Sequence, residues 1–595
     1  MSHNLIALRR GPDRFDVHGT ALQRLKQVME ERRVITADDV RAVARACGQP
    51  EAAVWGVATF YGDLSTEPRG RRRVRVCRGS ACHAEAGDAP VRWLERALGL
   101  RLGQTSPDGS VSLEPVYCLG FCHAAPVAAV ERHVVARLDE KAAQRLARSL
   151  DAPELPDAQR AAVPPCVVGG GPAIVLERLR HQGLDATRLE VARAHGVFEG
   201  LRRALQMTPD EVIAVLEGSG LRGRGGAGFP TGRKWRLAAP HARAADEAFV
   251  VANGDEGDPG SYIDKALMER DPFALLEGMA ICARAIGARR GVVYVRSEYP
   301  HATPRLRDAV EQARSAGLLG ERVLGTPFAF DVDVVEGAGS YVCGEETALL
   351  RSLEGLRGMV TARPPYPAER GLFERPTVVH NVETLANLGW ILRHGADAYA
   401  AWGTEQSRGT KCFCFNGLFE WPGIYEVPLG LTLRGLVEEV AGGLRVGHRI
   451  KAVQVGGPLG GILPAHELDV RLGFEEMAAR GALLGHGSVV AWDERTSARA
   501  IAEHLLEFAA DESCGKCFPC RIGTHRALEI VRRLDPARPA AERRADAELL
   551  LELLETMRLG SLCAHGGAIP DPIASLFRHF GAELLGEPMA GEVRA

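Results

Sequence analysis

Residues 223–235 read GRGGAGFPTGRKW, and the interpretation of the whole chain starts from this stretch. Five of its first ten residues are glycine, and Arg224, Arg233 and Lys234 add positive charge. Glycine admits left-handed backbone conformations and lets a ligand approach closely. Successive backbone N–H groups in such a loop form an anion-binding concavity, and a basic side chain at its edge adds charge for a phosphate. The stretch therefore predicts a phosphate-cradling loop.

This loop is not one of the two common nucleotide-binding motifs. The G-x-G-x-x-G pattern is present, in Gly223, Gly225 and Gly228. However, the dinucleotide-binding motif follows a strand, whereas Thr208 and Glu211 form a capping signature that predicts a helix over 210–217. The Walker A pattern fails because Arg233 separates Gly232 from Lys234. We therefore expect a phosphate loop of another kind.

Composition and charge narrow the class of protein. A chain of 595 residues suggests about four domains of roughly 150 residues each, and the net charge of −3 indicates neither nucleic acid nor anionic membrane as a partner. We find no apolar run suited to a signal peptide or to a span of roughly 20 residues. We therefore expect a cytoplasmic protein, in which disulfides are rare. The 14 cysteines then call for metal or redox explanations.

The pattern along the chain predicts an α/β and α+β multidomain protein. Helical spacing dominates the N-terminal part, strands and helices alternate in the middle, and glycine-rich turns with short strands precede a helical C-terminal part. The expected parts are an N-terminal helical bundle over 1–70, a small α/β domain over 71–150, a linker over 151–175, an α/β domain over 176–405, a β-rich domain over 406–475 and a helical domain over 476–595.

Four cysteines near the C-terminus predict an iron–sulfur cluster. Cys514, Cys517 and Cys520 form C-x2-C-x2-C, and Cys563 follows at a distance. Three closely spaced cysteines with a remote fourth are a common arrangement for [4Fe–4S], which needs four thiolates. The alternative is a structural zinc site with four thiolates. Zinc sites usually pair two C-x2-C knuckles, so the three-plus-one pattern favours the cluster.

Four cysteines near the N-terminus form two pairs, Cys77 with Cys82 and Cys118 with Cys122. Two pairs on facing loops suit a [2Fe–2S] cluster, one pair for each iron, and zinc is the alternative on spacing alone. The remaining six are expected to be packing residues. They are Cys47, Cys166, Cys282, Cys343, Cys412 and Cys414.

Polar residues follow two further predicted elements. The run NGDEGD at 253–258 comes directly after a β-rich run, and Gly344, Glu345 and Glu346 open a predicted helix. Carboxylates and amides at such positions can bind ribose hydroxyls or flavin edges. The spacing of the run is not that of an EF-hand calcium loop. Acidic residues also stabilise the first turn of a helix, so a purely structural role for Glu345 and Glu346 stays open.

Two regions of the chain resemble subunits of complex I (NADH:quinone oxidoreductase). Residues from about 190 to 595 resemble its flavoprotein subunit in the strings GLRGRGGAGFPTGRKW, NGDEGDPGSY, GAGSYVCGEETALLRSLEG, RPPYPAERGLF, HNVETL and ESCGKCFPCRIG. Residues from about 18 to 150 resemble its thioredoxin-like [2Fe–2S] subunit in WGVATFY, VCRGSACH and CLGFCHAAP. The resemblance implies a thioredoxin-like domain, an α/β FMN-binding domain, a ubiquitin-like β-grasp segment of SLBB type and a C-terminal helical bundle with [4Fe–4S].

The resemblance also implies the cofactors FMN, NAD(H), one [2Fe–2S] and one [4Fe–4S], with hydride passing between the nicotinamide and the flavin. The implied FMN contacts are Gly223, Arg224, Gly225, Lys234, Asn253, Asp255, Glu256, Gly344, Glu345, Glu346 and Asn381. The implied NADH contacts are Phe229, Asp258, Glu346, Arg363 and Tyr366. Among these, Glu346 is expected to orient or exclude ligands through its charge.

The chain departs from the complex I pattern in two respects. Asp258 stands where that family usually has Glu, Leu237 replaces an aromatic residue, Arg363 a lysine and His380 an asparagine. In addition, the two subunits are fused, which resembles the diaphorase subunits of soluble NAD-dependent formate dehydrogenases and NAD-reducing hydrogenases. The first expectation is therefore a diaphorase subunit of a formate dehydrogenase whose partner carries a molybdenum- or tungsten-pterin.

Three alternatives to this first expectation remain, in order of preference. The first is the same module on a hydrogenase, and the second is complex I itself. The third belongs to a different class and is a zinc-stabilised scaffold without redox activity.

Overall fold

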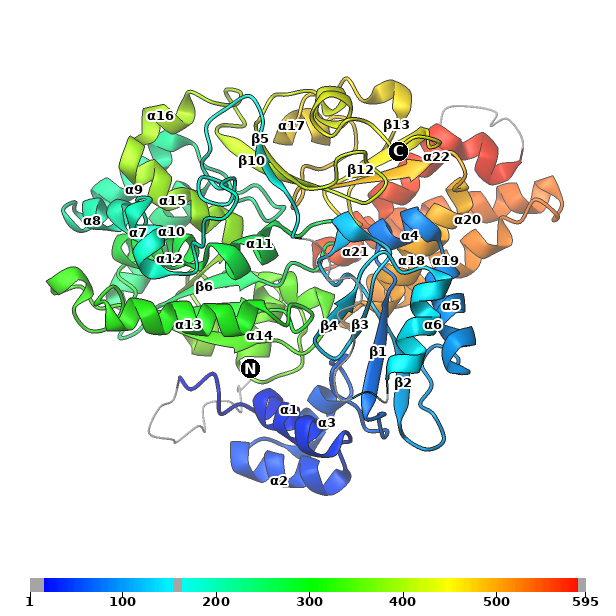
Figure 1. Ribbon diagram of the computed structural model, residues 1–595, viewed down its shortest axis with the longest axis horizontal. Coiled ribbons are helices and arrows are strands. Elements are labelled where there is room, and N and C mark those ends of the chain that lie inside the picture. The colour runs from blue at the N-terminus through cyan, green and yellow to red at the C-terminus, as the bar shows by residue number, and fades with distance from the viewer. Residues whose placement is uncertain (1–14, 151, 153–162, 587–595) are drawn as a thin grey trace.

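The computed structural model describes residues 15–150, 152 and 163–586. Figure 1 shows the N-terminal helices below the green α/β domain, the small α/β domain beside both, and the β-rich and C-terminal parts above and to the right. None of the helices in the described ranges is both long enough and apolar enough to span a bilayer.

Three helices open the described chain, α1 (Ala21–Arg32), α2 (Ala37–Cys47) and α3 (Glu51–Ala58). The predicted cap at Thr36 is confirmed, because its hydroxyl and the Asp39 carboxylate form a capping box. The apolar residues of these helices, such as Leu22 and Leu25, share one core with Phe249 and Val292 of the central sheet. The N-terminal helices therefore cover the α/β domain.

The small domain is thioredoxin-like, with four strands in the order β2-β1-β3-β4. Its strands and helices are β1 (Arg72–Cys77), α4 (Ser80–Ala86), α5 (Ala89–Leu98), β2 (Val111–Val116), the short turn η2 (Cys122–Ala124), β3 (Ala128–Val130), β4 (His133–Val135) and α6 (Glu140–Ser149). Strand β1 runs parallel to β2, with Cys77 opposite Val116. Because parallel strands end at the same edge of a sheet, the loops that carry the four predicted ligands meet there.

The central domain holds a parallel sheet in the order β8-β7-β6-β9. Its strands are β6 (Phe249–Gly254), β7 (Arg290–Val295), β8 (Asp331–Glu336) and β9 (Thr377–Asn381). Its helices are α7 (Leu189–Ala194), α8 (Glu199–Leu205), α9 (Pro209–Ser219), α10 (Thr231–Ala244), α11 (Ile263–Arg270), α12 (Pro272–Ile286), α13 (Ala302–Ser315), α14 (Glu346–Leu353), α15 (Val382–His394) and α16 (Ala396–Ala400). Strands β7 and β8 extend the sheet from one side of β6. Strand β9 then pairs with the opposite side of β6, so the direction in which the sheet grows reverses between β6 and β9. Ligands of open α/β sheets bind at the carboxyl ends of strands at such a point.

A second sheet of six strands has the order β13-β12-β14-β10-β11-β5. Its elements are β5 (Cys166–Val168), β10 (Thr410–Phe415), β11 (Ile424–Pro428), β12 (Ile450–Val455), β13 (Ile462–Pro464), α17 (Phe474–Ala478) and β14 (Ser488–Asp493). The sequence predicts a linker over 151–175, of which 151 and 153–162 lie outside the described residues, and an end of the β-rich part at 475. In the structure β5 pairs with β11, and β14 lies between β10 and β12. These three pairings join residues that are far apart in sequence, which local patterns do not reveal.

The C-terminal part is helical, as predicted, and contains α18 (Ala498–Asp511), α19 (Phe518–Arg533), α20 (Ala540–Gly560), α21 (Ala564–Ala568) and α22 (Pro570–Leu585). Cys517 is the residue before α19, and Cys563 is the residue before α21. The turn between α20 and α21 lies beside the start of α19, since a side chain at Gly560 would meet Pro519. The fold thus brings the remote cysteine to the other three.

Candidate functional site

The glycine loop lies between α9 and α10, as the sequence predicted. The capping box of Thr208 and Glu211 opens α9, and the loop is closed by a hydrogen bond of 2.9 Å from Gly223 N to Phe229 O. Gly226 has φ 128°, and a Cβ atom built on it meets nothing within 4 Å. A Cβ at Gly225 would lie 2.8 Å from the Cβ of Asn381. Glycine is therefore required where the loop packs on β9, and open space lies above Gly226.

Arg224 does not present its side chain to this space. The residue is fully buried, and its guanidinium donates to Tyr399 Oη and to the carbonyl oxygens of residues 222, 408 and 410 at 2.8 to 3.1 Å. Its backbone N–H donates to the Thr384 hydroxyl at 2.8 Å. The side chain thus fixes the loop to the second sheet. Lys234 of the same stretch is only half-buried and stays available as a basic group.

Four charged side chains form a row beside the loop. Lys234 Nζ lies 2.8 Å from Val379 O and 3.2 Å from Glu346 Oε2. The guanidinium of Arg363 pairs with Glu346 at 2.8 Å and with Glu345 at 2.9 Å. The second oxygen of Glu345 caps α14 by accepting from two backbone N–H groups. The structure therefore brings residues predicted for FMN and for NADH into direct contact, and Glu345 has a structural role as well.

The carboxyl ends of β6 and β9 carry two predicted FMN contacts side by side. Asn253 and Asn381 are paired in register across these strands. The amide of Asn253 donates to Gly344 O at 2.8 Å, and the Asn381 side chain caps α15. His380, the neighbour of Asn381, is buried and accepts from the Trp235 indole at 2.7 Å. Burial lowers the pKa of His380 well below its usual value, so it is neutral.

The acidic run after β6 provides a test of whether a flavin fits here. Asp255 is half-buried, and its Oδ2 is shielded from solvent and has no hydrogen-bond partner among the described residues. Burial raises the pKa of this carboxyl well above its usual value. A buried acceptor without a donor is costly, and a ligand that offers N–H or O–H groups would satisfy it. Together with the open glycine loop and Lys234, this arrangement fits a phosphorylated ligand with a polar ring edge.

Asp258 is held by Tyr341, whose hydroxyl donates to Asp258 Oδ1 at 2.7 Å. Burial raises the pKa of Asp258 from its usual value. Two of the predicted NADH contacts are aromatic and exposed, with 43% of Phe229 and 54% of Tyr366 accessible. Exposed aromatic faces are suited to stacking on a base or a nicotinamide.

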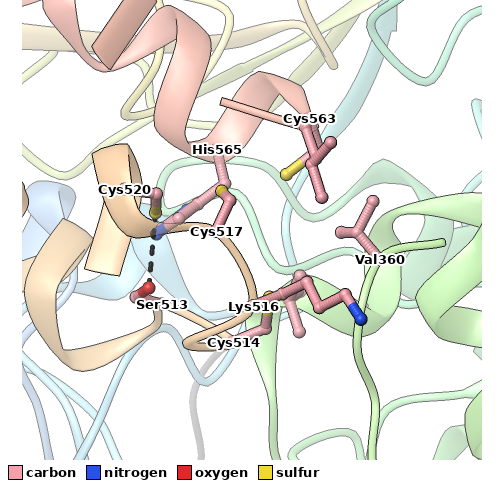
Figure 2. Close-up of a pocket in the computed structure, with 10 residues that line it drawn as sticks. Val360, Ser513, Cys514, Lys516, Cys517, Cys520, Cys563 and His565 are labelled. Carbon is pink, nitrogen blue, oxygen red and sulfur yellow. Dashed lines mark hydrogen bonds between the residues drawn. The ribbon is translucent and has the colours of Figure 1, made fainter. Parts of the chain in front are cut away.

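The C-terminal cysteines line one pocket (Figure 2). Figure 2 shows Cys514, Cys517 and Cys520 on a common segment, while Cys563 reaches the pocket from another. Burial raises the pKa of Cys520 to about 12 and that of Cys563 to about 11. A metal cluster binds thiolates and displaces these protons. Four cysteines converging on one pocket fit a tetranuclear cluster.

The N-terminal cysteines are buried at the edge of the small sheet. Cys118 Sγ and Cys122 Sγ are 3.5 Å apart, and the backbone N–H groups of Gly79 and Gly120 point to Cys77 Sγ and Cys118 Sγ. A hydrogen bond from Cys82 lowers the pKa of Cys77 to about 7. Backbone N–H donors beside thiolates are typical of iron–sulfur sites, so both predicted pairs fit a binuclear cluster.

Two links that the sequence analysis missed connect these sites. The short turn η4 (Tyr341–Gly344) carries the predicted FMN contact Gly344, whose carbonyl accepts from Asn253 Nδ2, while Val342 lines the cysteine pocket. Arg296 donates to Tyr117 O at 3.0 Å, one residue before Cys118, and its other nitrogen donates to Glu256 O. Tyr341 is within a recognised string, but nothing in the local sequence around Arg296 indicates its role.

Three families match separate parts of the chain. Residues 216–390 match the Nuo51 FMN-binding domain, residues 13–151 the thioredoxin-like [2Fe-2S] ferredoxin and residues 500–586 the NADH-ubiquinone oxidoreductase-F iron-sulfur binding region. The fold and the sites thus define an iron–sulfur flavoprotein of the NAD(H)-dependent oxidoreductases. The expected cofactors FMN, [2Fe–2S] and [4Fe–4S] are confirmed over the zinc alternatives.

Relatives align over much of the chain. The F 2 subunit of the NADH-quinone oxidoreductase of Rhizobium meliloti (strain 1021) is 42% identical over 402 residues, which cover 67% of this chain and 94% of the relative. NADP-reducing hydrogenase subunit HndC of Solidesulfovibrio fructosivorans is 46% identical over 386 residues, covering 65% of this chain and 78% of the relative. The chain belongs to the same family as this NADH-quinone oxidoreductase subunit and is a member with a fused thioredoxin-like [2Fe–2S] domain.

A solved structure matches nearly the whole chain. It is a chain of the NAD+-reducing [NiFe]-hydrogenase in the H2-reduced state, with a TM-score of 0.82 and 33% sequence identity. The match covers 96% of this chain and 93% of that chain. The fused arrangement of the two modules therefore occurs in a known enzyme.

Proposed function

We propose that this chain exchanges electrons between NAD(H) and a partner oxidoreductase in a cytoplasmic complex. One observation carries the proposal. The turn η4 carries the expected FMN contact Gly344 only two residues from Val342, which lines the cysteine pocket. This spacing supports a flavin bound near Gly344 and beside the cluster that receives its electrons.

Residues of this chain bind and orient the reactants in this proposal. Lys234 and the N–H groups of the glycine loop hold the phosphate of FMN, while Asn253, Asp255 and Asn381 hold its ring edge. Phe229 and Tyr366 stack on the dinucleotide. Bound FMN supplies hydride exchange with nicotinamide and single-electron exchange with iron–sulfur clusters. Glu346 keeps Lys234 and Arg363 in place through its two ion pairs.

An exposed apolar surface beside the tetranuclear site suits a partner subunit. Phe518 and Ile522 lie one turn apart on α19, with 75% and 50% of their surface exposed. Leu559 and Leu562, at 78% and 43%, lie next to them across the contact between residues 519 and 560. Leu562 also lines the cysteine pocket. Large exposed apolar patches mark protein interfaces, and this one lies where an electron would leave.

We propose formate as the substrate of the partner, which would be a subunit with a molybdenum- or tungsten-pterin and further iron–sulfur clusters. The fused domain order, shared with diaphorase subunits of such enzymes, supports this assignment. Hydrogen is the second candidate. It is favoured by the match over 96% of this chain to a structure of NAD+-reducing [NiFe]-hydrogenase.

Two measurements test these proposals. The purified single chain, loaded with FMN and iron, is expected to reduce an artificial electron acceptor with NADH and to leave formate and hydrogen unchanged. Formate oxidation by the single chain would contradict the need for a partner. The native complex is then purified and assayed for NAD+ reduction with formate or hydrogen. A complex that contains molybdenum or tungsten and reduces NAD+ with formate supports formate as the substrate. A complex that contains nickel and reduces NAD+ with hydrogen supports hydrogen in its place.

The apolar surface has its own test. The double substitution Phe518→Ser and Ile522→Ser is expected to abolish co-purification of the partner while leaving NADH-driven reduction of the artificial acceptor intact. Val446→Ser serves as the matched control, because Val446 is 99% exposed in the loop before β12. Retention of the partner by the double variant would place its binding surface elsewhere.

A further inference from the structure

Three buried ionisable groups lie behind the flavin crevice. His486 precedes β14, Glu256 follows β6, and Asp264 lies in α11; all three are buried. His486 Nε2 is 2.9 Å from Asp264 Oδ2, and His486 Nδ1 is 3.6 Å from Glu256 Oε1. An imidazole between two carboxylates suits either a divalent cation or a proton on the ring.

The hydrogen bonds of the two carboxylates favour the proton. Both oxygens of Glu256 and both oxygens of Asp264 already accept hydrogen bonds at 2.6 to 3.1 Å. The donors are Ser261 Oγ, Asp264 N, Lys265 N, Tyr299 Oη, Glu383 N and Asn381 Nδ2. A cation would have to compete with these donors for the same lone pairs. A doubly protonated imidazole instead donates from Nε2 to Asp264 Oδ2 and places its second N–H, and its positive charge, 3.6 Å from Glu256 Oε1.

The contact of 2.9 Å between His486 Nε2 and Asp264 Oδ2 also favours a proton on Nε2. Asn381 Oδ1 accepts from Thr384 N, so its amide nitrogen is turned towards Asp264 and His486. If His486 Nε2 carried no hydrogen, it could accept from Asn381 Nδ2 at 2.9 Å, but its lone pair would also face the Asp264 carboxylate at 2.9 Å. With a hydrogen on Nε2, both Asn381 and His486 donate to Asp264 Oδ2.

The loop of His486 is tied to the glycine loop through Lys411. The Lys411 ammonium donates to His486 O and to Arg224 O, both at 3.2 Å, and pairs with the Glu383 carboxylate. Lys411 and Glu383 are both fully buried. Asn381, in turn, packs against Gly225. The ring of His486 therefore supports Asn381 against the glycine loop, and its backbone carbonyl is linked to the same loop through Lys411.

We propose that His486 is a positioning residue of the flavin site, whose imidazolium between Glu256 and Asp264 holds Asn381 against the glycine loop and adds positive charge behind the flavin. The proposal rests on the proposed FMN contacts. Positive charge near the ring stabilises the anionic reduced flavin, so His486 would raise the reduction potential as well as the affinity for FMN.

The charges that face His486 come from several elements. Burial alone lowers its pKa, but Asp264 and Glu256 raise it to about 9 against the opposing effect of Lys411. Asp258, in the same loop as Glu256, also lies within the field of His486. The ring is therefore charged at neutral pH and loses its proton as the pH rises through about 9.

The test uses His486→Gln in the full chain, with His448→Gln as the matched control, because His448 also pairs with a carboxylate, that of Asp493. The dissociation constant of FMN, followed by flavin fluorescence, is expected to rise roughly tenfold in His486→Gln and to stay unchanged in His448→Gln. The midpoint potential of bound FMN is expected to fall in His486→Gln. Unchanged affinity and potential would overturn the proposal.

Two further measurements keep the proposal testable if His486→Gln fails to fold. Wild-type FMN affinity is expected to be constant from pH 6.5 to 8 and to weaken above pH 9; an affinity that does not change across pH 9 overturns the proposal. Metal analysis of the wild type is expected to give iron alone. The wild type could instead hold one equivalent of another divalent metal that is absent from His486→Gln or from Asp264→Asn. That result would overturn the proposal, because it would show a bound cation between the carboxylates and not a protonated imidazole. Failure of the FMN assignment itself would differ, because Lys234→Gln, at the expected phosphate contact, would then also leave flavin binding unchanged.

Discussion

The guanidinium of Arg224 donates a hydrogen bond of 2.8 Å to the hydroxyl of Tyr399, which directs the arginine of the glycine loop into the protein. Sequence alone suggested that this arginine contributes charge for a phosphate. Its side chain instead satisfies three carbonyl oxygens and a phenol. Substitution of Arg224 should therefore lower the stability of the fold, whereas substitution of Lys234 should lower the affinity for FMN.

Arg224→Gln is expected to lower the free energy of unfolding by about 3 kcal/mol or more, since each buried carbonyl left without a donor costs about 1–3 kcal/mol. Lys234→Gln is expected to weaken FMN binding with little change in that free energy, because Lys234 is only half-buried. Urea unfolding and flavin fluorescence measure the two quantities. If the Arg224→Gln protein is as stable as the wild type but has lost affinity for FMN, Arg224 contributes to binding the phosphate and not to holding the loop.

The contrast between Arg224 and the cysteines shows what sequence could and could not predict. Cys514, Cys517 and Cys520 carry their own signal, because cluster chemistry demands thiolates at short spacing. The direction of the Arg224 side chain depends on residues 399, 408 and 410, which only the folded chain brings near. The same holds for His486, whose partners lie in the loop after β6, on α11 and on β9, and whose local sequence resembles an ordinary turn.

Cys563→Ala is expected to remove the tetranuclear EPR signal and to leave the binuclear one. The wild type should hold about six irons in one [2Fe–2S] and one [4Fe–4S] cluster. Cys282→Ala is the matched control, since Cys282 is a buried free thiol on α12 away from both sets. Its iron content should equal that of the wild type. A Cys563→Ala protein with an unchanged spectrum would exclude Cys563 as a ligand.

Asp258→Asn tests nucleotide choice. A carboxylate accepts hydrogen bonds from ribose hydroxyls and repels a 2′-phosphate. The substitution is therefore expected to shift the ratio of kcat/KM for NADH and NADPH by about 1–2 kcal/mol towards NADPH, as for one buried charge-assisted hydrogen bond. Tyr341→Phe is informative beside it, because it removes the hydroxyl that donates to Asp258 and leaves the charge. If the ratio stays constant in Asp258→Asn, another residue reads the ribose.

The stability of the protein should depend on pH through His486. Its pKa is about 9 in the folded state and about 6.5 in an unfolded chain, so folding binds a proton between these values. The stabilisation is then complete below about pH 6.5 and is lost as the pH rises through 9. At about 1.4 kcal/mol per unit of pKa, the free-energy difference between wild type and His486→Gln should shrink by about 3 kcal/mol from pH 6 to pH 9.5. Urea unfolding at both pH values measures this difference, and other groups that titrate near pH 9.5 cancel in it. The His448→Gln protein should keep the wild-type dependence, because His486 and its two carboxylates are intact there. A difference that is constant across this range would mean that His486 carries no extra proton in the folded state.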